Sequence, residues 1–285
     1  MENKNRETFS GKTIIISGSS KGIGKVLARE LGLMGANIIL NGTNAENLAN
    51  TSKELLGMGI ECTAVKGNVA VMNDCRRMAE IALKQYGSID AVIANAGLTT
   101  SGSLEDSNVE IFKQLMDVNY AGTVYLIKAC LPALKKSMGS ILITGSASGF
   151  RGIPGNAAYC ASKMALTALA DALKIELFKT NIHVGIAYVG FTENDPDKTM
   201  LDTNGKLVIK EKIARGPVAS QRAVALQMIS MIRHRTFKKN FSFLGKVNAL
   251  VVRFAPWLGD IILKNHYFKT TDSKSFDKLV EYPFT

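Results

Sequence analysis

The sequence of 285 residues is poor in cysteine, histidine and tryptophan. Its four cysteines are scattered and form no C-x-x-C pair, which argues against a disulfide framework and a cysteine metal site. No group of histidine and acidic residues has the spacing of metal ligands, so we expect no catalytic metal. Isolated cysteines are typical of small buried side chains in a reducing compartment, and we expect a cytoplasmic protein. The cysteines are Cys62, Cys75, Cys130 and Cys160.

Internal repeats, low-complexity segments and uninterrupted apolar runs of membrane-spanning length are also missing. Residues 1–7 are polar and include acids, which predicts no signal peptide. Residues 243–264 are largely apolar, but charges such as Lys246 and Arg253 interrupt them. Pro256 would break or kink a helix there, so we do not expect a membrane span.

Acidic residues are outnumbered, and the formal net charge of +11 favours polyanionic partners. NADP(H), acyl-phosphopantetheine carriers and anionic lipid all fit this charge. No basic stretch is interleaved with aromatic residues and no nucleic-acid motif is present, so we expect no nucleic-acid partner.

The remaining sequence alternates short apolar runs with helical patterns. The alternation predicts a Rossmann-type α/β fold, a doubly wound parallel sheet with helices on both faces. We expect one domain, residues 1–285, in which residues 191–285 form a substrate lid and an extended apolar C-terminal segment. Predicted strands cover residues 13–16, 37–41, 61–66, 90–94, 140–144, 183–188 and 241–243. Predicted helices cover residues 45–56, 72–85, 109–135 with a bend or end at Pro132, and 157–178.

A glycine-rich turn follows the first predicted strand. It contains Gly18, Gly22 and Gly24 in a G-x-x-x-G-x-G spacing, and a helical pattern follows. Glycines let a backbone turn tightly and approach a ligand closely. The start of the helix offers free N–H groups and a positive dipole end to a pyrophosphate.

Tyr159 and Lys163 lie four residues apart in a predicted helix, so their side chains share one face. An ammonium beside a phenol favours the phenolate and lowers its pKa. A tyrosine tuned in this way can exchange a proton with a carbonyl or alcohol oxygen.

Further motifs stand at fixed offsets from this pair. Ser146 precedes Tyr159 by 13 residues and Asn119 precedes it by 40, and Asn95-Ala96-Gly97 follows the fourth predicted strand. Together with the glycine turn, this set resembles the short-chain dehydrogenase/reductase family over residues 12 to about 192.

The resemblance implies a catalytic set of Asn119, Ser146, Tyr159 and Lys163. Tyr159 would protonate the alkoxide that forms when a ketone is reduced. Lys163 would lower the pKa of Tyr159 and hold the nicotinamide ribose. Ser146 would bond the substrate oxygen, and Asn119 would hold a water that relays protons through Lys163.

The resemblance also implies where a dinucleotide binds. The second strand is followed by no carboxylate, which an NAD site usually has there, and Lys21 could pair with a 2′-phosphate. We therefore expect NADP(H) rather than NAD(H). Thr43 replaces the basic residue of many NADP-using relatives, Asn68 replaces an aspartate, and Val189 replaces a proline. The expected cofactor-binding residues are Gly18, Ser20, Lys21, Gly22, Ile23, Gly24, Thr43, Asn44, Asn68, Val69, Asn95, Ala96, Gly97, Tyr159, Lys163, Gly190 and Thr192.

The expected function is NADPH-dependent reduction of a bulky, hydrophobic ketone to a secondary alcohol. The outline resembles the branches of the family that reduce 3-ketosphinganine and steroids. Reduction of a 3-oxoacyl thioester and a non-catalytic NADP(H) sensor are the alternatives. Residues 243–264 could contact a membrane peripherally, cap the substrate pocket or join a subunit interface, and we expect a homo-oligomer.

Overall fold

Seven parallel strands form the central sheet of the computed structural model, which describes residues 9–209 and 218–271. The strand order is β3-β2-β1-β4-β5-β6-β9, and the register pairs Ile15 of β1 with Ile39 and Val92 on its two sides. Every residue of β1, β4, β5 and β6 is buried, as parallel strands covered on both faces require. The strands are β1 (Thr13–Ile16), β2 (Asn37–Gly42), β3 (Cys62–Lys66), β4 (Ala91–Ala94), β5 (Ser140–Ser146), β6 (His183–Val189) and β9 (Lys238–Asn240).

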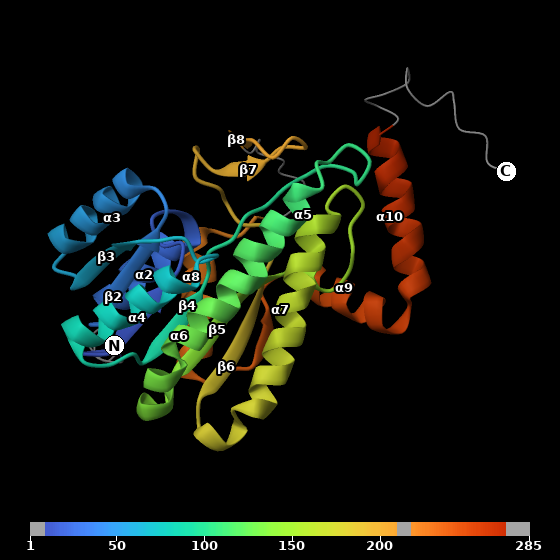
Figure 1. Ribbon diagram of the computed structural model, residues 1–285. Helices are drawn as coiled ribbons and strands as arrows, with labels where there is room; N and C mark the ends of the chain where they lie inside the picture. The colour runs from blue at the N-terminus through green and yellow to red at the C-terminus, as the bar shows by residue number, and fades with distance from the viewer. Residues whose placement is uncertain (1–8, 210–217, 272–285) are drawn as a thin grey trace.

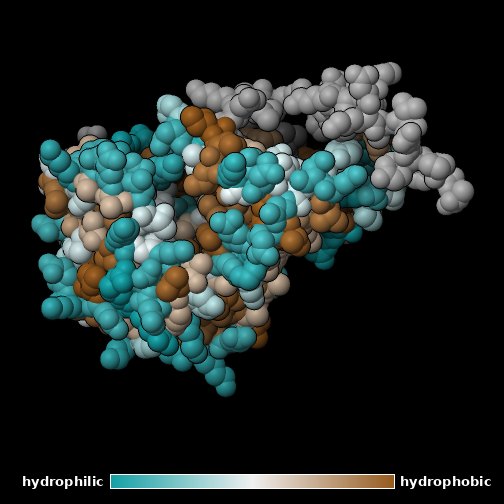
Figure 2. Space-filling view, turned by 45° about the horizontal axis from the view of Figure 1, so that its top comes forward, coloured by the Kyte–Doolittle hydropathy of each residue, from teal (hydrophilic) through white to brown (hydrophobic). Residues whose placement is uncertain are grey.

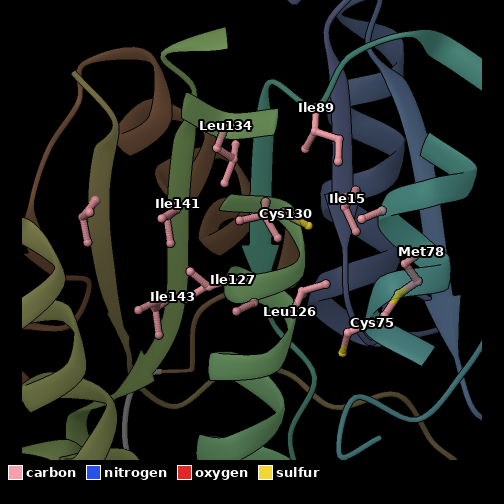
Figure 3. Packing of buried hydrophobic residues seen from close by; sticks show 14 of the residues in the cluster. Ile15, Cys75, Met78, Ile89, Leu126, Ile127, Cys130, Leu134, Ile141 and Ile143 are labelled. Atoms are coloured by element: carbon pink, nitrogen blue, oxygen red, sulfur yellow. The ribbon is translucent and has the colours of Figure 1, made fainter. Parts of the chain in front are cut away.

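Helices cover both faces of this sheet (Figure 1). The predicted doubly wound fold is therefore confirmed. One face packs against α4 (Met72–Tyr86), α6 (Gly122–Ser137) and α7 (Ala157–Glu176), and Figure 3 shows part of this core. The other face packs against α2 (Gly22–Leu33), α3 (Ala45–Gly57) and α8 (Gln221–Arg233). Of these three helices, only α8 was not predicted from the sequence.

The helical pattern predicted for residues 109–135 is divided into three parts. A short helix, α5 (Glu110–Leu115), leads into a π-helical turn, η1 (Met116–Ala121), and then into α6. Of the bend or end expected at Pro132, the end does not occur, because α6 continues to Ser137. The carbonyl that loses its hydrogen bond to Pro132 belongs to Lys128, an exposed residue where water can satisfy it.

The C-terminal third adds a hairpin and two helices. The hairpin, β7 (Thr199–Leu201) and β8 (Leu207–Ile209), lies at the top of Figure 1. Residues 210–217 and 272–285 of the predicted lid and C-terminal segment lie outside the described residues. The helices α9 (Phe243–Phe254) and α10 (Pro256–Thr271) lie on the side of α7, away from α3 (Figure 1). The break expected at Pro256 is confirmed.

The strand predicted for residues 241–243 is wrong. The edge strand β9 comes earlier, at Lys238–Asn240, and pairs with β6. Ser242 instead caps α9, because its side chain accepts a hydrogen bond from the backbone N of Gly245 at 3.0 Å. Within the described ranges, no helix is long and apolar enough to cross a membrane.

Candidate active site

The glycine turn between β1 and α2 packs directly against the turn that follows β4. Gly18 has a φ of +61°, and a Cβ added to it would lie 2.8 Å from the Cα of Ala96. A Cβ added to Gly24 would lie 2.2 Å from the carbonyl oxygen of Gly18 and 2.6 Å from Nδ2 of Asn95. Neither position has room for a side chain, so the two turns form one closely packed backbone cradle.

Hydrogen bonds fix this cradle. Ser17 Oγ accepts from the backbone N of Asn95 at 2.9 Å and from that of Ala96 at 3.0 Å. Asn95 Nδ2 donates to the carbonyl of Gly18 at 3.1 Å. The side chain of Asn95 is therefore used within the protein, and it positions the glycine turn.

Asn41, at the end of β2, is a positioning residue that sequence reasoning missed. Its buried side chain accepts from the backbone N of Gly18 at 3.3 Å. The same amide donates to the carbonyls of Val65 at 3.2 Å and Gly67 at 3.0 Å. It thus ties the glycine turn to the end of β3. The sequence showed only that no carboxylate is present there.

Three of the four residues expected to be catalytic meet between the end of β5 and the start of α7. The Tyr159 hydroxyl is hydrogen-bonded to the side chain of Ser146. Lys163 Nζ lies 5.8 Å from the centre of the Tyr159 ring and donates to the carbonyl of Thr144 at 2.9 Å. Ser146 Oγ also accepts from the backbone N of Ser148 at 3.1 Å.

The electrostatics of this pair differ from the sequence-based expectation. Burial raises the pKa of Tyr159 above its ordinary value, and the hydrogen bond to Ser146 opposes the rise only partly. Burial also lowers the pKa of Lys163 to about 8. Lys163 is not among the groups that shift the pKa of Tyr159 here, because its amine donates to the carbonyl of Thr144. The expected lowering of the Tyr159 pKa by Lys163 is therefore not seen in this structure.

The depressed pKa of Lys163 has a measurable consequence for stability. The unfolded chain binds a proton at this lysine up to its ordinary pKa of 10.5, whereas the folded chain releases it from about pH 8. The unfolded state binds more protons between these values, so the contribution of Lys163 to stability rises with pH there. Between about pH 7.5 and about pH 9.5, the free energy of unfolding of the unaltered protein should rise by about 2 kcal/mol relative to that of Lys163→Met.

Urea unfolding of both proteins at the two pH values measures this difference, and it cancels groups common to both. An unchanged difference would mean that Lys163 keeps its ordinary pKa.

Asn119, the fourth expected residue, lies fully buried in the π-helical turn. Its Oδ1 accepts from the backbone N of Leu98 at 2.7 Å, and its Nδ2 donates to the carbonyl of Leu98 at 3.0 Å and to Ser162 Oγ at 2.9 Å. A Cβ added to Gly97 would lie 3.1 Å from Asn119 Oδ1 and 3.6 Å from Lys163 Nζ. Gly97 is therefore beside both side chains, and the four expected residues lie around one point of the sheet edge.

The other expected cofactor-binding residues all follow strands β1, β2, β3, β4 or β6. Asn44 caps α3 by accepting from the backbone N of Asn47 at 2.8 Å, so its side chain is already used. The side chain of Val69 is buried near Gly122, which leaves its backbone for a ligand. The positions that complete this set are Ser20, Lys21, Gly22, Ile23, Thr43, Asn68, Gly190 and Thr192.

Two of these positions contact parts of the chain that the sequence did not connect to them. Gly190 approaches the start of α9, where a Cβ added to it would lie 2.8 Å from Cβ of Ser242. Lys21 contacts Asp197 in the segment after β6. No cluster of histidine, cysteine and acidic residues suited to a metal ion occurs in residues 9–209 and 218–271.

Comparisons with known proteins identify the family of this chain. A family model described as short chain dehydrogenase matches residues 12–204. An 11-beta-hydroxysteroid dehydrogenase-like protein, 4A, of Arabidopsis thaliana is 33% identical over 193 residues, which are 67% of this chain and 64% of that protein. An 11-beta-hydroxysteroid dehydrogenase of Pinus massoniana is 28% identical over 94% of this chain and 78% of its own length.

Solved structures share the fold. A dehydrogenase/reductase from Sinorhizobium meliloti superposes with a TM-score of 0.73 at 23% identity, over 84% of this chain and 98% of that one. An alcohol dehydrogenase from Thermococcus sibiricus, complexed with 5-hydroxy-NADP, gives a TM-score of 0.69 at 23% identity over 81% and 95% of the two chains. The family model covers well over half of the sequence, and the chain belongs to the short-chain dehydrogenase family.

Proposed function

We propose that this protein is an NADPH-dependent oxidoreductase that reduces a bulky, apolar ketone to a secondary alcohol. The observation that carries the proposal is the arrangement at the end of β5, where Tyr159 bonds Ser146 and a buried Lys163 lies beside its ring. These side chains face the same sheet edge as the glycine cradle. This arrangement would put a proton donor beside a dinucleotide site, which supports the proposal.

The cradle suits a dinucleotide. Gly18 and Gly24 leave no space for side chains, so a ligand can approach the backbone at the start of α2, where free N–H groups favour a diphosphate. NADPH bound there would supply a hydride to the carbonyl carbon of the substrate. Lys163 would hold the nicotinamide ribose, and Gly190 and Thr192 would hold the carboxamide and diphosphate end.

The raised pKa of Tyr159 supports the direction of reduction. A phenol that stays protonated near neutral pH can donate its proton to the oxygen of a ketone as negative charge develops on it. Ser146 would donate a hydrogen bond to the same oxygen and stabilise that charge. Lys163, with a pKa of about 8, can return a proton towards Tyr159.

The surroundings of Tyr159 support an apolar substrate. Its ring packs against a small cluster formed by residues of α5, α7 and β7 and by the turn after β4. The Arabidopsis and Pinus relatives carry names that refer to a hydroxysteroid, which is also a bulky apolar alcohol. The residues of the cluster are Leu98, Ile111, Phe112, Leu115, Ala158 and Leu201.

A panel of ketones with NADPH as reductant tests the function. Steroid ketones, long-chain 3-keto bases and 3-oxoacyl thioesters should be compared, with consumption followed by the absorbance of NADPH. We expect consumption with at least one apolar ketone, and much less with NADH at equal concentration. Tight NADPH binding without any consumption would favour a sensor instead.

We further propose that residues 191–285 work as a lid and C-terminal extension of one nucleotide-binding domain. Ile175, near the end of α7, and Phe178, just after α7, are 71% and 77% exposed, which supports a homo-oligomer. All four cysteines are free thiols, which supports a cytoplasmic location.

The α9–α10 pair is our candidate for peripheral contact with an anionic membrane. Three large apolar side chains on it are strongly exposed, Leu250 at 59%, Phe254 at 74% and Trp257 at 63%. On the face of the molecule seen in Figure 2, apolar and hydrophilic side chains are interspersed. Exposed Lys246, Arg253 and Lys264 on the same helices would face anionic headgroups.

Flotation with anionic vesicles tests this contact. Replacing Lys246, Arg253 and Lys264 together by Ala should lower vesicle binding by roughly two orders of magnitude, at about 1 kcal/mol per basic side chain. A control that replaces Lys135, Lys136 and Lys179, which are also exposed, by Ala should bind as the unaltered protein does. Unaltered protein that stays at the bottom of the gradient would contradict the contact.

A further inference from the structure

An acidic segment, residues 193–198, lies against the glycine turn. Asp195 Oδ2 accepts a hydrogen bond from the backbone N of Gly22 at 2.8 Å. Gly22 is the first residue of α2, and Lys21 before it provides no side-chain cap. A carboxylate from a distant part of the chain therefore satisfies an N–H at the start of this helix.

The same segment also contacts the ammonium of Lys21. Lys21 Nζ lies 3.5 Å from Asp197 Oδ2 and donates to the backbone carbonyl of Asp197 at 3.3 Å. The two acids thus reach two neighbouring positive groups of the turn, one on the backbone and one on a side chain.

Gln221 at the start of α8 holds Asp195 in place. Its Nε2 donates to Asp195 Oδ1 at 2.8 Å and to the carbonyl of Glu193 at 3.3 Å. Its backbone N donates to Glu193 Oε1 at 2.7 Å, and the side chain is nearly buried. Both oxygens of Asp195 are therefore engaged, which distinguishes it from an ordinary surface acid.

The segment is continuous with the lid hairpin. Residues 193–198 lead directly into β7, and Leu201 of β7 donates through its backbone N to the carbonyl of Thr99 at 2.9 Å. Movement of the acidic segment would therefore displace β7, whose Leu201 belongs to the apolar cluster around Tyr159. The segment, the turn and α8 line one cavity, which includes Ser20, Lys21, Gly22, Asp195, Asp197 and Gln221.

We propose that Asp195 and Asp197 are internal competitors of the cofactor phosphates, an inference that rests on the proposed function. A carboxylate and a phosphate compete for the same N–H donors at a helix start and for the same ammonium. Asp195 competes with the diphosphate for the N–H groups at the start of α2, and Asp197 competes with the 2′-phosphate for the ammonium of Lys21. Binding of NADPH displaces the acidic segment, and the cofactor thereby controls the position of the lid.

Calorimetric titration of the full chain with NADPH and with NADH tests the competition. Asp197→Ala should strengthen NADPH binding about twofold to fivefold, the range of an exposed ion pair, and leave NADH binding unchanged. Asp195→Ala should strengthen binding of both dinucleotides about threefold to tenfold. Glu80→Ala, which removes one exposed acid on α4, serves as the control and should change neither.

The thermal stability of the free protein separates competition from simple structural support. Asp195→Ala should melt at a lower temperature than the unaltered protein, because α2 loses its cap, and yet bind dinucleotide more tightly. A variant that melts lower and also binds more weakly would overturn the proposal. So would an equal effect of Asp197→Ala on NADPH and NADH. Unaltered protein that binds neither dinucleotide would instead refute the proposed function.

Discussion

Tyr159→Phe should lower ketone reduction by about two to four orders of magnitude, the usual contribution of a positioned proton donor. The variant keeps the ring, which packs against the cluster of apolar residues beside α5 and α7. It loses only the hydroxyl that bonds Ser146. NADPH affinity should therefore change by less than about threefold, because the glycine cradle is untouched.

The matched control is Tyr86→Phe. Tyr86 also has a hydroxyl in a side-chain hydrogen bond, to Thr63 at 2.9 Å, and burial also raises its pKa. It lies on α4, away from the candidate site, so activity should stay at the level of the unaltered enzyme. Steady-state rates with one reducible ketone, together with NADPH titrations, check both variants. Equal activity in Tyr159→Phe would remove Tyr159 from the reaction.

Gly24→Ala should have the second-largest effect, because the structure has no room for the added methyl group. The new Cβ would lie 2.2 Å from the carbonyl oxygen of Gly18 and 2.6 Å from Nδ2 of Asn95. Both neighbours belong to the cradle, so relief of the clash must move the cradle itself. We expect a loss of about 1–3 kcal/mol in the free energy of unfolding and a loss of more than about tenfold in NADPH affinity.

Gly57→Ala is the control for this substitution. Gly57 is also helical, at the end of α3, and a Cβ added to it would meet nothing within 4 Å. Replacing a helical glycine by alanine raises the free energy of unfolding by about 0.5–1 kcal/mol where there is space for the methyl group. The Gly57→Ala variant should therefore be at least as stable as the unaltered protein. Urea unfolding and NADPH titration of the two variants give the comparison. A Gly24→Ala protein that binds NADPH normally would contradict the close-packed cradle.

The parts of the fold that the sequence predicted are those with a strong local pattern. The first strand, Ile14 to Ile16 with Thr13, is a run of β-branched residues, and it forms the buried centre of the sheet. The edge strand β9 consists of Lys238, Lys239 and Asn240 and carries no apolar residue. Only its pairing with β6 makes it a strand, and this pairing is invisible in the local sequence.

The candidate site shows the same division. The offsets of Ser146 and Asn119 from Tyr159 indicated which residues would meet, and the structure brings them to one sheet edge. The sign of the pKa shift of Tyr159 could not be predicted, because it depends on burial and on the direction that Lys163 takes. The contact of Asp195 with α2 depends on how the chain returns after β6, and the local sequence indicated only a polar turn.

Transfer of an isotope label tests the central claim most directly. NADPH carrying deuterium at the transferable position of the nicotinamide would be incubated with the protein and an apolar ketone, and the alcohol analysed by mass spectrometry. We predict an alcohol that gains one deuterium at the former carbonyl carbon, with formation almost abolished in Tyr159→Phe. An alcohol without the label, or no alcohol from any apolar ketone despite bound NADPH, would contradict the assignment as a ketone reductase.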